Sequence, residues 1–314
     1  MNLIFFGTSA FAARVLRDLI QNGIAISAIV TRPDKPKGRA LQLLPPPVKE
    51  EVLKLGLDIP IYQPLKASTP EFAEILDSQK PDLFVVVAYG EIMKTLLLKI
   101  PSRGCINVHA SLLPKYRGAS PIQRCLMQGE LETGVTIMQM VLEMDAGDML
   151  SVVKTPIPPE MTFGELDHNL SSLAAPALIT VIQQIEEGSV KKIPQDHALA
   201  TFTSKLTAKE EEIHWERPAE EIHNLIRALS PFPGAWCFVQ IGGEKKRLKI
   251  KLSKVVDNLQ GSPGQVLTLT KQELIIACGK GALQVLQLQL EGKRMMSVKD
   301  FLQGLHSPPA IVGE

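Results

Sequence analysis

The strongest constraint on the fold is the alternation of short apolar runs with helical patterns along the first half of the 314-residue chain. Residues 3–6 are apolar and meet Gly7, and a helical stripe through residues 11–19 follows. Strands that alternate with helices form right-handed crossover units, which build a mostly parallel sheet. We therefore predict a Rossmann-like α/β domain with helices on both faces of the sheet, whose further strands are residues 24–30, 83–88, 106–108 and 135–140.

The sequence pattern changes between residues 188 and 207. Thr162 and Glu165 are spaced as a capping box, which predicts a long helix that ends near Gly188. Residues 189–206 lose the periodicity and are predicted to be a linker. A short helix after Pro218 then precedes five short strands, which fit a small β-barrel of the OB type. We predict a first domain over 1–188 and an OB-like domain over 207–314, with strands at 236–241, 247–252, 265–269, 274–278 and 283–290.

Charge and cysteine content exclude several classes of protein. The chain has 34 Lys and Arg against 33 Asp and Glu, so it is not basic throughout, although a local basic patch remains compatible. The four cysteines are far apart and form no CxxC pair, which argues against a zinc knuckle or a disulfide scaffold. The start of the chain has no signal-peptide pattern, and no apolar run approaches ~20 residues. We expect a cytoplasmic protein without membrane contact or metal.

The first turn after residues 3–6 is a possible phosphate site. A dinucleotide-binding turn needs the pattern G-x-G-x-x-G, but Ser9 and Ala12 stand where the second and third glycines belong. A plain tight turn at Gly7 is therefore the better interpretation, and a nicotinamide dehydrogenase is disfavoured.

Asn107 and His109 are the best candidates for chemistry. They are two residues apart at the end of a buried strand, so their side chains share one face. An amide donor beside an imidazole suits acyl transfer, because the amide binds a developing oxyanion and the imidazole moves protons. A purely structural pair at a strand end fits the spacing as well. Asp145 and Asp148 follow a later strand, and either one could face His109 or simply form a turn.

Two basic segments could bind phosphate. Residues 32–49 form an unusually long loop with five prolines and the cations Arg32, Lys35, Lys37, Arg39 and Lys49. Residues 244–254 carry six basic residues and one acid. Strand alternation there predicts Leu248, Ile250 and Leu252 inside and Arg247, Lys249 and Lys251 outside. In both segments, a solvated surface is the alternative to a binding role.

The motifs together resemble the folate-dependent formyltransferase family. Residues 105–118 (CINVHASLLPKYRG) followed by Pro121, and residues 134–137 running to 144–150, resemble the two core signatures of that family. The segments at 7–8 and 85–90 match as well. Residues 226–235 (IRALSPFPGA) resemble the members of the family that act on an aminoacylated tRNA. The resemblance covers nearly the whole chain.

The resemblance implies a reaction and a set of site residues. It implies transfer of a formyl group from 10-formyltetrahydrofolate to the α-amino group of methionyl initiator tRNA, by a monomer that needs no metal. The family's catalytic residues correspond to Asn107, His109 and Asp145. Asn107 and His109 are expected to stabilise the oxyanion, and Asp145 to hold His109 in its working protonation state. The implied folate site comprises Ser111, Leu112, Leu113, Pro114, Ala88, Tyr89 and Gly90, and the implied tRNA contacts comprise Lys35, Lys37, Arg39, Arg247, Lys249 and Lys251.

Other functions remain compatible with the same residues. A formyltransferase for glycinamide ribonucleotide would not need the residues after about 206, whereas an amino-sugar formyltransferase can carry a similar second domain. A hydrolase that deformylates the folate would leave the basic strand without a purpose. A non-catalytic RNA-binding protein on a degenerate enzyme fold is disfavoured by the intact set of Asn107, His109 and Asp145.

Overall fold

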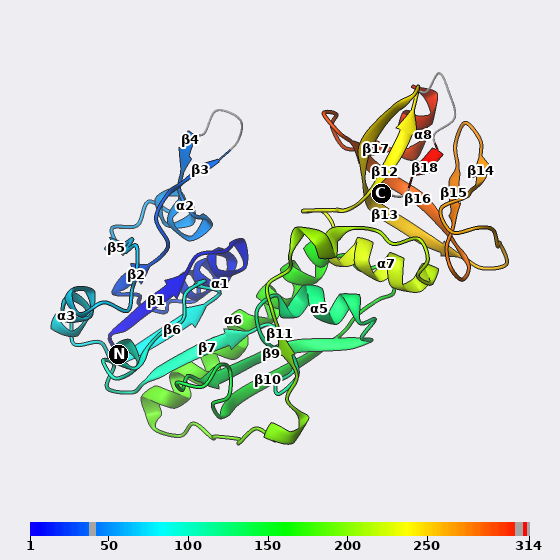
Figure 1. Ribbon diagram of the computed structural model, residues 1–314. Helices are drawn as coiled ribbons and strands as arrows, with labels where there is room; N and C mark the ends of the chain where they lie inside the picture. The colour runs from blue at the N-terminus through cyan, green and yellow to red at the C-terminus, as the bar shows by residue number, and fades with distance from the viewer. Residues whose placement is uncertain (38–41, 305–309, 313–314) are drawn as a thin grey trace. The chain divides into compact units, whose positions relative to one another are not determined.

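The computed structural model describes residues 1–37, 42–304 and 310–312, which belong to two compact units (Figure 1). The first unit comprises Met1–Gly118, Glu132–Thr155 and Asp167–Phe202. The second comprises Ala119–Leu131, Pro156–Leu166 and Thr203–Glu314. Two short segments that lie between parts of the first unit, Ala119–Leu131 and Pro156–Leu166, therefore pack with the C-terminal part of the chain. Two domains divided at a single linker do not describe this arrangement.

The first unit is built on a seven-stranded sheet in the order β10-β9-β7-β6-β1-β2-β5. The five strands from β5 to β7 pair in parallel, and β9 pairs with β7 in the antiparallel direction. This confirms the mostly parallel sheet that the sequence predicts. The strands are β1 (Leu3–Gly7), β2 (Ala28–Val30), β5 (Ile61–Tyr62), β6 (Leu83–Val87), β7 (Cys105–His109), β9 (Glu132–Gln139) and β10 (Met149–Pro156).

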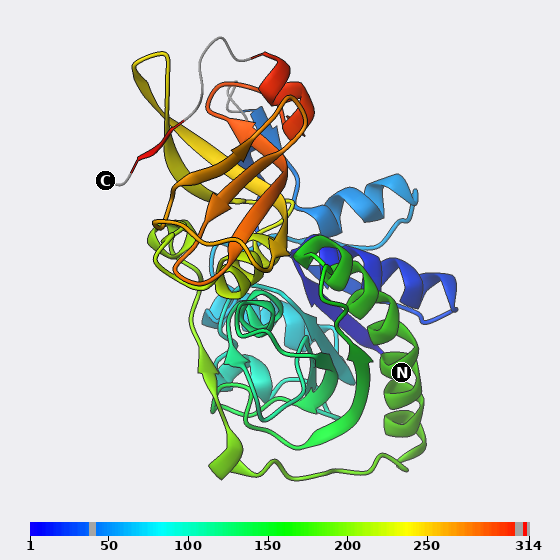
Figure 2. The ribbon, with the colours of Figure 1, turned by 90° about the vertical axis from the view of Figure 1, so that its right-hand side faces the viewer.

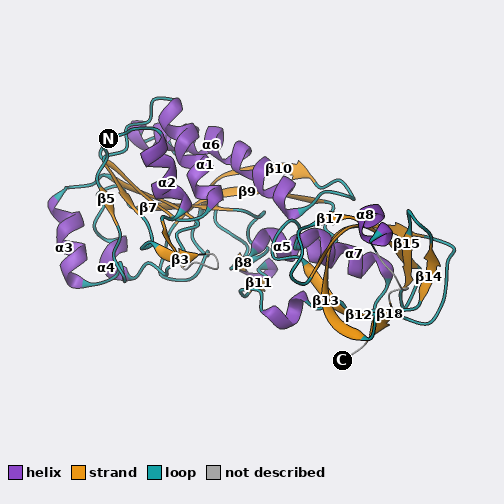
Figure 3. Cartoon of the chain, turned by 90° about the horizontal axis from the view of Figure 1, so that it is seen from above, coloured by secondary structure: helices purple, strands orange, loops and turns teal. Residues whose placement is uncertain are grey.

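Helices cover both faces of this sheet (Figure 3). The chain moves outward from β1 to β2 to β5, then returns to β6 and β7 on the other side of β1. Right-handed connections put the helices of these two movements on opposite faces. Arg14 in α1 donates to Ser171 in α6 (2.7 Å), so these two helices share one face. The helices of the first unit are α1 (Ala10–Gln21), α2 (Pro47–Lys54), α3 (Pro70–Ser78), α4 (Thr95–Leu98) and most of α6 (Phe163–Glu187).

Side-chain caps define where the helices begin. The Ser9 hydroxyl accepts a hydrogen bond from the Ala12 amide at the start of α1 (3.2 Å). At α6, the Thr162 amide donates to Glu165 (2.8 Å) and the Glu165 amide donates to the Thr162 hydroxyl (3.4 Å). This reciprocal pair is the capping box that the sequence predicts. Among the described residues, no helix is both long and apolar enough to cross a membrane.

Several short elements were not predicted from the sequence. The long basic loop contains a hairpin of β3 (Lys35–Lys37) and β4 (Gln42–Leu44), which pair in the antiparallel direction. The predicted linker contains the short helix η1 (His197–Leu199) and the strand β11 (Phe202–Thr203), which pairs with β8 (Arg117–Gly118). Each of these elements is two or three residues long, too short to show a periodicity in the sequence.

The second unit is a curled antiparallel sheet with helices, as the OB-like prediction requires (Figure 2). Its strand order is β14-β15-β16-β13-β12-β18, with β17 paired to β16. Strands and helices here are α5 (Pro121–Met127), η2 (Ala208–Glu211), α7 (Ala219–Ala228), β12 (Ala235–Ile241), β13 (Glu244–Val256), β14 (Val266–Leu269), β15 (Leu274–Ala277), β16 (Ala282–Leu290), β17 (Met296–Ser297), α8 (Val298–Gln303) and β18 (Ala310–Val312).

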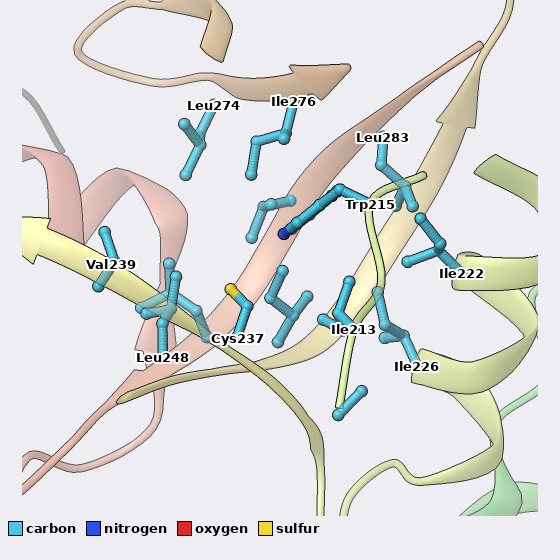
Figure 4. Packing of buried hydrophobic residues seen from close by; sticks show 14 of the residues in the cluster. Ile213, Trp215, Ile222, Ile226, Cys237, Val239, Leu248, Leu274, Ile276 and Leu283 are labelled. Atoms are coloured by element: carbon cyan, nitrogen blue, oxygen red, sulfur yellow. The ribbon is translucent and has the colours of Figure 1, made fainter. Parts of the chain in front are cut away.

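The core of the second unit lies between α7 and the concave face of its sheet (Figure 4). Ile222 and Ile226 of α7 point toward side chains of β12, β15 and β16, and the Trp215 ring lies among them. Burying such side chains contributes roughly 1.5–3 kcal/mol each, which explains why the apolar residues of α7 lie on one face of the helix.

The Arg124–Glu210 ion pair should make the second unit less stable in acid. Arg124 of α5 donates to the Glu210 carboxylate (2.6 Å), and the Thr207 amide also donates to it (2.9 Å). The Arg124 hydrogen bond first, and then that of Thr207, lower the pKa of Glu210 from 4.5 to about 2. Because the pKa is lowered in the folded state, this contribution is present above pH 4.5 and is lost as the pH falls toward about 2.

The unaltered chain should lose unfolding free energy between pH 5 and pH 3, and we expect Arg124→Met to make this loss smaller. The difference should be less than about 1 kcal/mol, because Glu210 is partly exposed. Denaturant titrations across this range provide the measurement. Arg217→Met removes a longer, exposed pair with Glu221 (3.9 Å) and serves as the control. Identical acid slopes for Arg124→Met and the unaltered chain would refute the assignment.

Candidate functional site

Asn107 and His109 lie at the carboxyl end of β7 and share one face of that strand. Hydrogen bonds to β6 on one side and to β9 on the other hold the strand in place. His109 is buried, whereas Asn107 is half-buried. Among the described residues, the side-chain amide of Asn107 has no hydrogen-bond partner, whereas its backbone pairs with β6 and β9. An amide held on a rigid strand is a pre-organised donor.

His109 lies between two acceptors. Its Nε2 atom is 2.8 Å from the Tyr116 carbonyl oxygen, and its Nδ1 atom is 3.7 Å from Oδ2 of Asp145. Because a carbonyl oxygen can only accept, Nε2 carries a proton in the first contact. A ring that also takes a proton at Nδ1 then faces a carboxylate. Nδ1 is therefore the ring nitrogen that faces the Asp145 carboxylate.

Asp145 is the acid that faces His109. The spacing alone left the choice between Asp145 and Asp148 open, whereas the family resemblance implied Asp145. Its Oδ2 atom also accepts a hydrogen bond from the Gly118 amide (2.8 Å), which orients the carboxylate. Its backbone is left-handed, with φ +50°. Asp tolerates this region better than most residues, but the conformation still needs support from its surroundings.

The turn after β6 exposes backbone next to the same edge of the sheet. Ala88 and Gly90 are exposed and have φ of +42° and +86°. Tyr89 between them is buried, and its carbonyl oxygen accepts from the Thr8 hydroxyl after β1 (2.7 Å). Burial raises the pKa of Tyr89 to about 12, so the phenol stays neutral. The two flanking residues thus lie exposed at this edge of the sheet.

Residues 111–114 follow His109 closely in the chain and are held in place by hydrogen bonds. The Ser111 hydroxyl donates to the Lys115 carbonyl (2.6 Å), and the Ser111 carbonyl accepts from the buried Thr136 hydroxyl (2.7 Å). The Thr136 hydroxyl also accepts from the Leu113 amide (3.2 Å). Ser111 and Leu113 are buried, whereas Leu112 and Pro114 are half-buried. Of residues 111–114, Leu112 and Pro114 are therefore the ones that a ligand can contact most readily.

No cysteine is placed for nucleophilic chemistry. Cys105, Cys125, Cys237 and Cys278 are all buried and form no disulfide. Burial raises the pKa of Cys105, Cys237 and Cys278 to about 12. Within the described residues, no group of three or more His, Cys, Asp or Glu side chains is arranged to hold a metal ion.

The predicted tRNA residues fall in two different surroundings. Lys35 is exposed on β3, and Lys37 ends that strand. Arg39 lies outside the described residues. On β13, Arg247 is exposed and its guanidinium lies 4.3 Å above the Trp236 ring. The Lys249 ammonium donates to the Pro233 carbonyl (3.0 Å).

The prediction that Lys251 lies on the exposed face of its strand is wrong. Lys251 is only 4% exposed, and its ammonium donates to the carbonyls of Pro231 (2.7 Å) and Pro233 (2.9 Å). The register of β13 against β16 shifts at Lys251, so the alternation that puts Leu252 inside and Lys251 outside breaks there. Gly234, with φ +88°, leaves room for this side chain, because a Cβ would lie 2.4 Å from the ammonium nitrogen.

Gln195 contacts the site, although it lies in the segment predicted to be a linker. Its Nε2 atom donates to the carbonyls of Asp145 (2.9 Å) and Gly147 (2.7 Å). Its Oε1 atom accepts from the buried Arg117 guanidinium (2.8 and 3.1 Å). A lone glutamine in an aperiodic stretch carries no sequence signal, which is why sequence reasoning missed it.

Comparison with known proteins identifies the class. The Formyl transferase family model matches residues 1–182, and the Formyl transferase, C-terminal domain model matches residues 205–306. The chain therefore belongs to the formyl transferase family.

Named relatives cover nearly the whole chain. It is 47% identical over 305 residues to the methionyl-tRNA formyltransferase of Protochlamydia amoebophila (strain UWE25), covering 97% of this chain and 95% of that protein.

Two solved structures share the fold. HypX from Aquifex aeolicus in complex with tetrahydrofolic acid matches with a TM-score of 0.65 and 17% identity, over 97% of this chain and 48% of HypX. The chain thus spans about half the length of HypX. The N-formyltransferase from Helicobacter canadensis in complex with folinic acid and dTDP-3-aminofucose matches with a TM-score of 0.66 and 19% identity, over 91% of this chain and 98% of that one.

Gly147 should be indispensable to the turn that carries Asp145. A Cβ atom at this position would lie 1.9 Å from the Gln139 carbonyl oxygen, so the turn would have to move. We expect Gly147→Ala to lower the free energy of unfolding of the first unit by about 1–3 kcal/mol. In the control, Gly304→Ala, the new Cβ meets nothing closer than 3.6 Å. Denaturant titration that finds both variants equally stable would show that the turn is not tightly packed.

Proposed function

We propose that the chain transfers a formyl group from 10-formyltetrahydrofolate to the α-amino group of methionyl initiator tRNA. The observation that carries this proposal is the Asn107 side-chain amide on the same strand face as the His109–Asp145 pair, in a chain that a named methionyl-tRNA formyltransferase matches over 97% of its length. The folate complexes of two proteins with the same fold support a folate as the formyl donor.

The residues present fit a folate formyl donor. Accessible backbone at Ala88 and Gly90 suits the hydrogen-bonding edge of a pterin, and Leu112 and Pro114 offer apolar contact to a ring. When it is bound, the folate supplies a formyl carbon that an amine can attack. These residues bind the donor and orient its formyl group toward Asn107.

Asn107 and His109 would then stabilise the charge that develops on the formyl oxygen. As the amine nitrogen bonds to the formyl carbon, the carbonyl oxygen becomes an oxyanion that accepts hydrogen bonds from the Asn107 side-chain amide and from the Nε2–H group of His109, which turns away from the Tyr116 carbonyl to do so. The proton that the amine loses passes by way of Nδ1 of His109 and the Asp145 carboxylate to the folate nitrogen, whose bond to the formyl carbon breaks. Donors fixed before the reaction cost no reorganisation during it.

The second unit is proposed to hold the RNA. Arg247 offers an exposed guanidinium stacked on Trp236, and such groups bind phosphate and ribose oxygens well. Lys35, Lys37 and Arg39 would contact the acceptor end. We assign Lys251 to the support of the loop at Pro231 and Pro233, and Lys249 to that loop as well as to the RNA surface. The proposed function implies that the protein acts in the cytoplasm, where translation begins.

An amino-sugar nucleotide is the second candidate acceptor. The N-formyltransferase complexed with dTDP-3-aminofucose shares the fold over nearly its full length. Its 19% identity supports the fold alone, whereas the tRNA enzyme from Protochlamydia amoebophila is 47% identical. The tRNA acceptor is therefore the better supported of the two.

A formyl-transfer assay with purified protein and 10-formyltetrahydrofolate tests the function. We expect formylation of methionyl initiator tRNA and none of uncharged tRNA or dTDP-3-aminofucose. Asn107→Ala and His109→Ala should each lower kcat by roughly 10²–10³, because each removes an oxyanion donor. The exposed Asn258→Ala variant is the control. Transfer to the sugar alone, or full activity of both site variants, would overturn the proposal.

Arg247 and Lys251 should respond differently to removal of their charge. Arg247→Ala should weaken tRNA binding and reduce the slope of log affinity against log salt by about one, because one phosphate contact is lost. Lys251→Met should instead lower the free energy of unfolding by about 1.5–3 kcal/mol, since two carbonyls lose a charged donor. Binding titrations at four salt concentrations and denaturant titrations separate the two effects. An unchanged slope for Arg247→Ala would remove it from the RNA surface.

A further inference from the structure

Residues 193–201, called the strap here, hold two catalytic loops of the first unit together. Ile193 exchanges two backbone hydrogen bonds with Met149, both 2.8 Å. At the other end of the strap, the Tyr116 amide donates to the Thr201 hydroxyl and the Arg117 amide donates to the Thr201 carbonyl, again at 2.8 Å. The strap therefore runs from the strand after Asp145 to the loop after His109.

Gln195 is the buried centre of the strap. Only 5% of it is exposed, and both ends of its amide are used. Because Oε1 must accept from the Arg117 guanidinium, Nε2 must face the carbonyls of Asp145 and Gly147. Arg117 is 1% exposed and also lies 3.2 Å from Nδ1 of His197, so it fixes the orientation of the amide.

The Asp145 backbone needs this support. A non-glycine residue in the left-handed region costs of order 1–3 kcal/mol and persists only where its surroundings hold it. At Asp145, the carbonyl is held by Gln195 and the carboxylate by the Gly118 amide. Arg117 and Gly118 are adjacent in one loop. Gly118 holds the Asp145 carboxylate directly, and Arg117 holds the Asp145 carbonyl through Gln195.

We propose that Gln195 is a positioning residue, which sets the Asp145 carboxylate against His109 by holding the Asp145 and Gly147 carbonyls. This inference rests on the proposed function, because the consequence is measured in formyl transfer. Gln195 itself touches no group that the reaction changes. Its loss should therefore lower kcat and leave the KM for either substrate unchanged.

The sharpest test is Gln195→Glu, which keeps the shape of the side chain. The acceptor for Arg117 remains, but an oxygen replaces the donor that faces two carbonyls, so the turn at Asp145 is pushed away. Displacement by about 1 Å commonly costs about 10²-fold in rate, and we expect a loss of that size in kcat. Gln195→Met removes the donor without the repulsion and should lose about 10-fold. Asp196→Asn, which keeps the acceptor at the start of η1, is the matched control.

A double-mutant cycle with Asp145→Asn separates positioning from a general loss of structure. If Gln195 acts through Asp145, Gln195→Glu should cost less than threefold in the Asp145→Asn background. Equal losses in both backgrounds, a raised KM with unchanged kcat, or activity equal to that of the unaltered chain would overturn the inference. If the unaltered chain transfers no formyl group at all, the proposed function itself fails, and the inference with it.

Discussion

The rest of the site depends on the common edge at which three parallel strands end. Gly7 of β1 stands opposite Val87 of β6, and Val87 stands opposite Val108 of β7. The residues that follow these positions therefore emerge together, as is usual for ligand sites in open α/β sheets. Thr8, the turn at Ala88–Gly90, and His109 are neighbours for this reason alone. Backbone pairing in a buried sheet sets their positions more firmly than any loop could.

Around that edge the chain adopts unfavourable backbone conformations. Ala88, Tyr116 and Asp145 all have positive φ, and each lies in a turn that faces the carboxyl end of the sheet. Each conformation costs of order 1–3 kcal/mol, which the buried core of the sheet and local hydrogen bonds must offset. These backbone conformations place the Tyr116 carbonyl and the Asp145 carboxylate next to the two ring nitrogens of the buried His109.

Sequence periodicity predicted the parts of this protein that depend on burial. The strands at residues 3–7 and 83–87 follow from continuous apolar runs, and the start of α6 follows from the capping-box spacing of Thr162 and Glu165. The shared face of Asn107 and His109 follows from the two-residue period of a strand. The predicted strand over 24–30 was too long, since β2 begins only at Ala28. A buried apolar run does not show where hydrogen bonding to its neighbour starts.

The remaining features depend on contacts that leave no periodic trace. Spacing alone does not choose between Asp145 and Asp148, and the turn with positive φ is what carries Asp145 to His109. The role of Gln195 depends on the Asp145 carbonyl and the Arg117 side chain, which lie 50 and 78 positions away in the sequence. The burial of Lys251 follows from two adjacent register shifts, on either side of Leu252, in an otherwise regular strand. A register shift cannot be predicted from the alternation of residues along a strand. After such a shift, the following side chains point to the opposite face of the sheet.

The most direct test of the account is a crystal structure with a 10-formyl folate analogue that cannot release its formyl group. The account predicts the formyl oxygen at about 3 Å from Nδ2 of Asn107, within hydrogen-bonding reach of His109, and the pterin against the backbone of residues 88–90. A folate bound with its formyl group away from Asn107, or at another edge of the sheet, would contradict it.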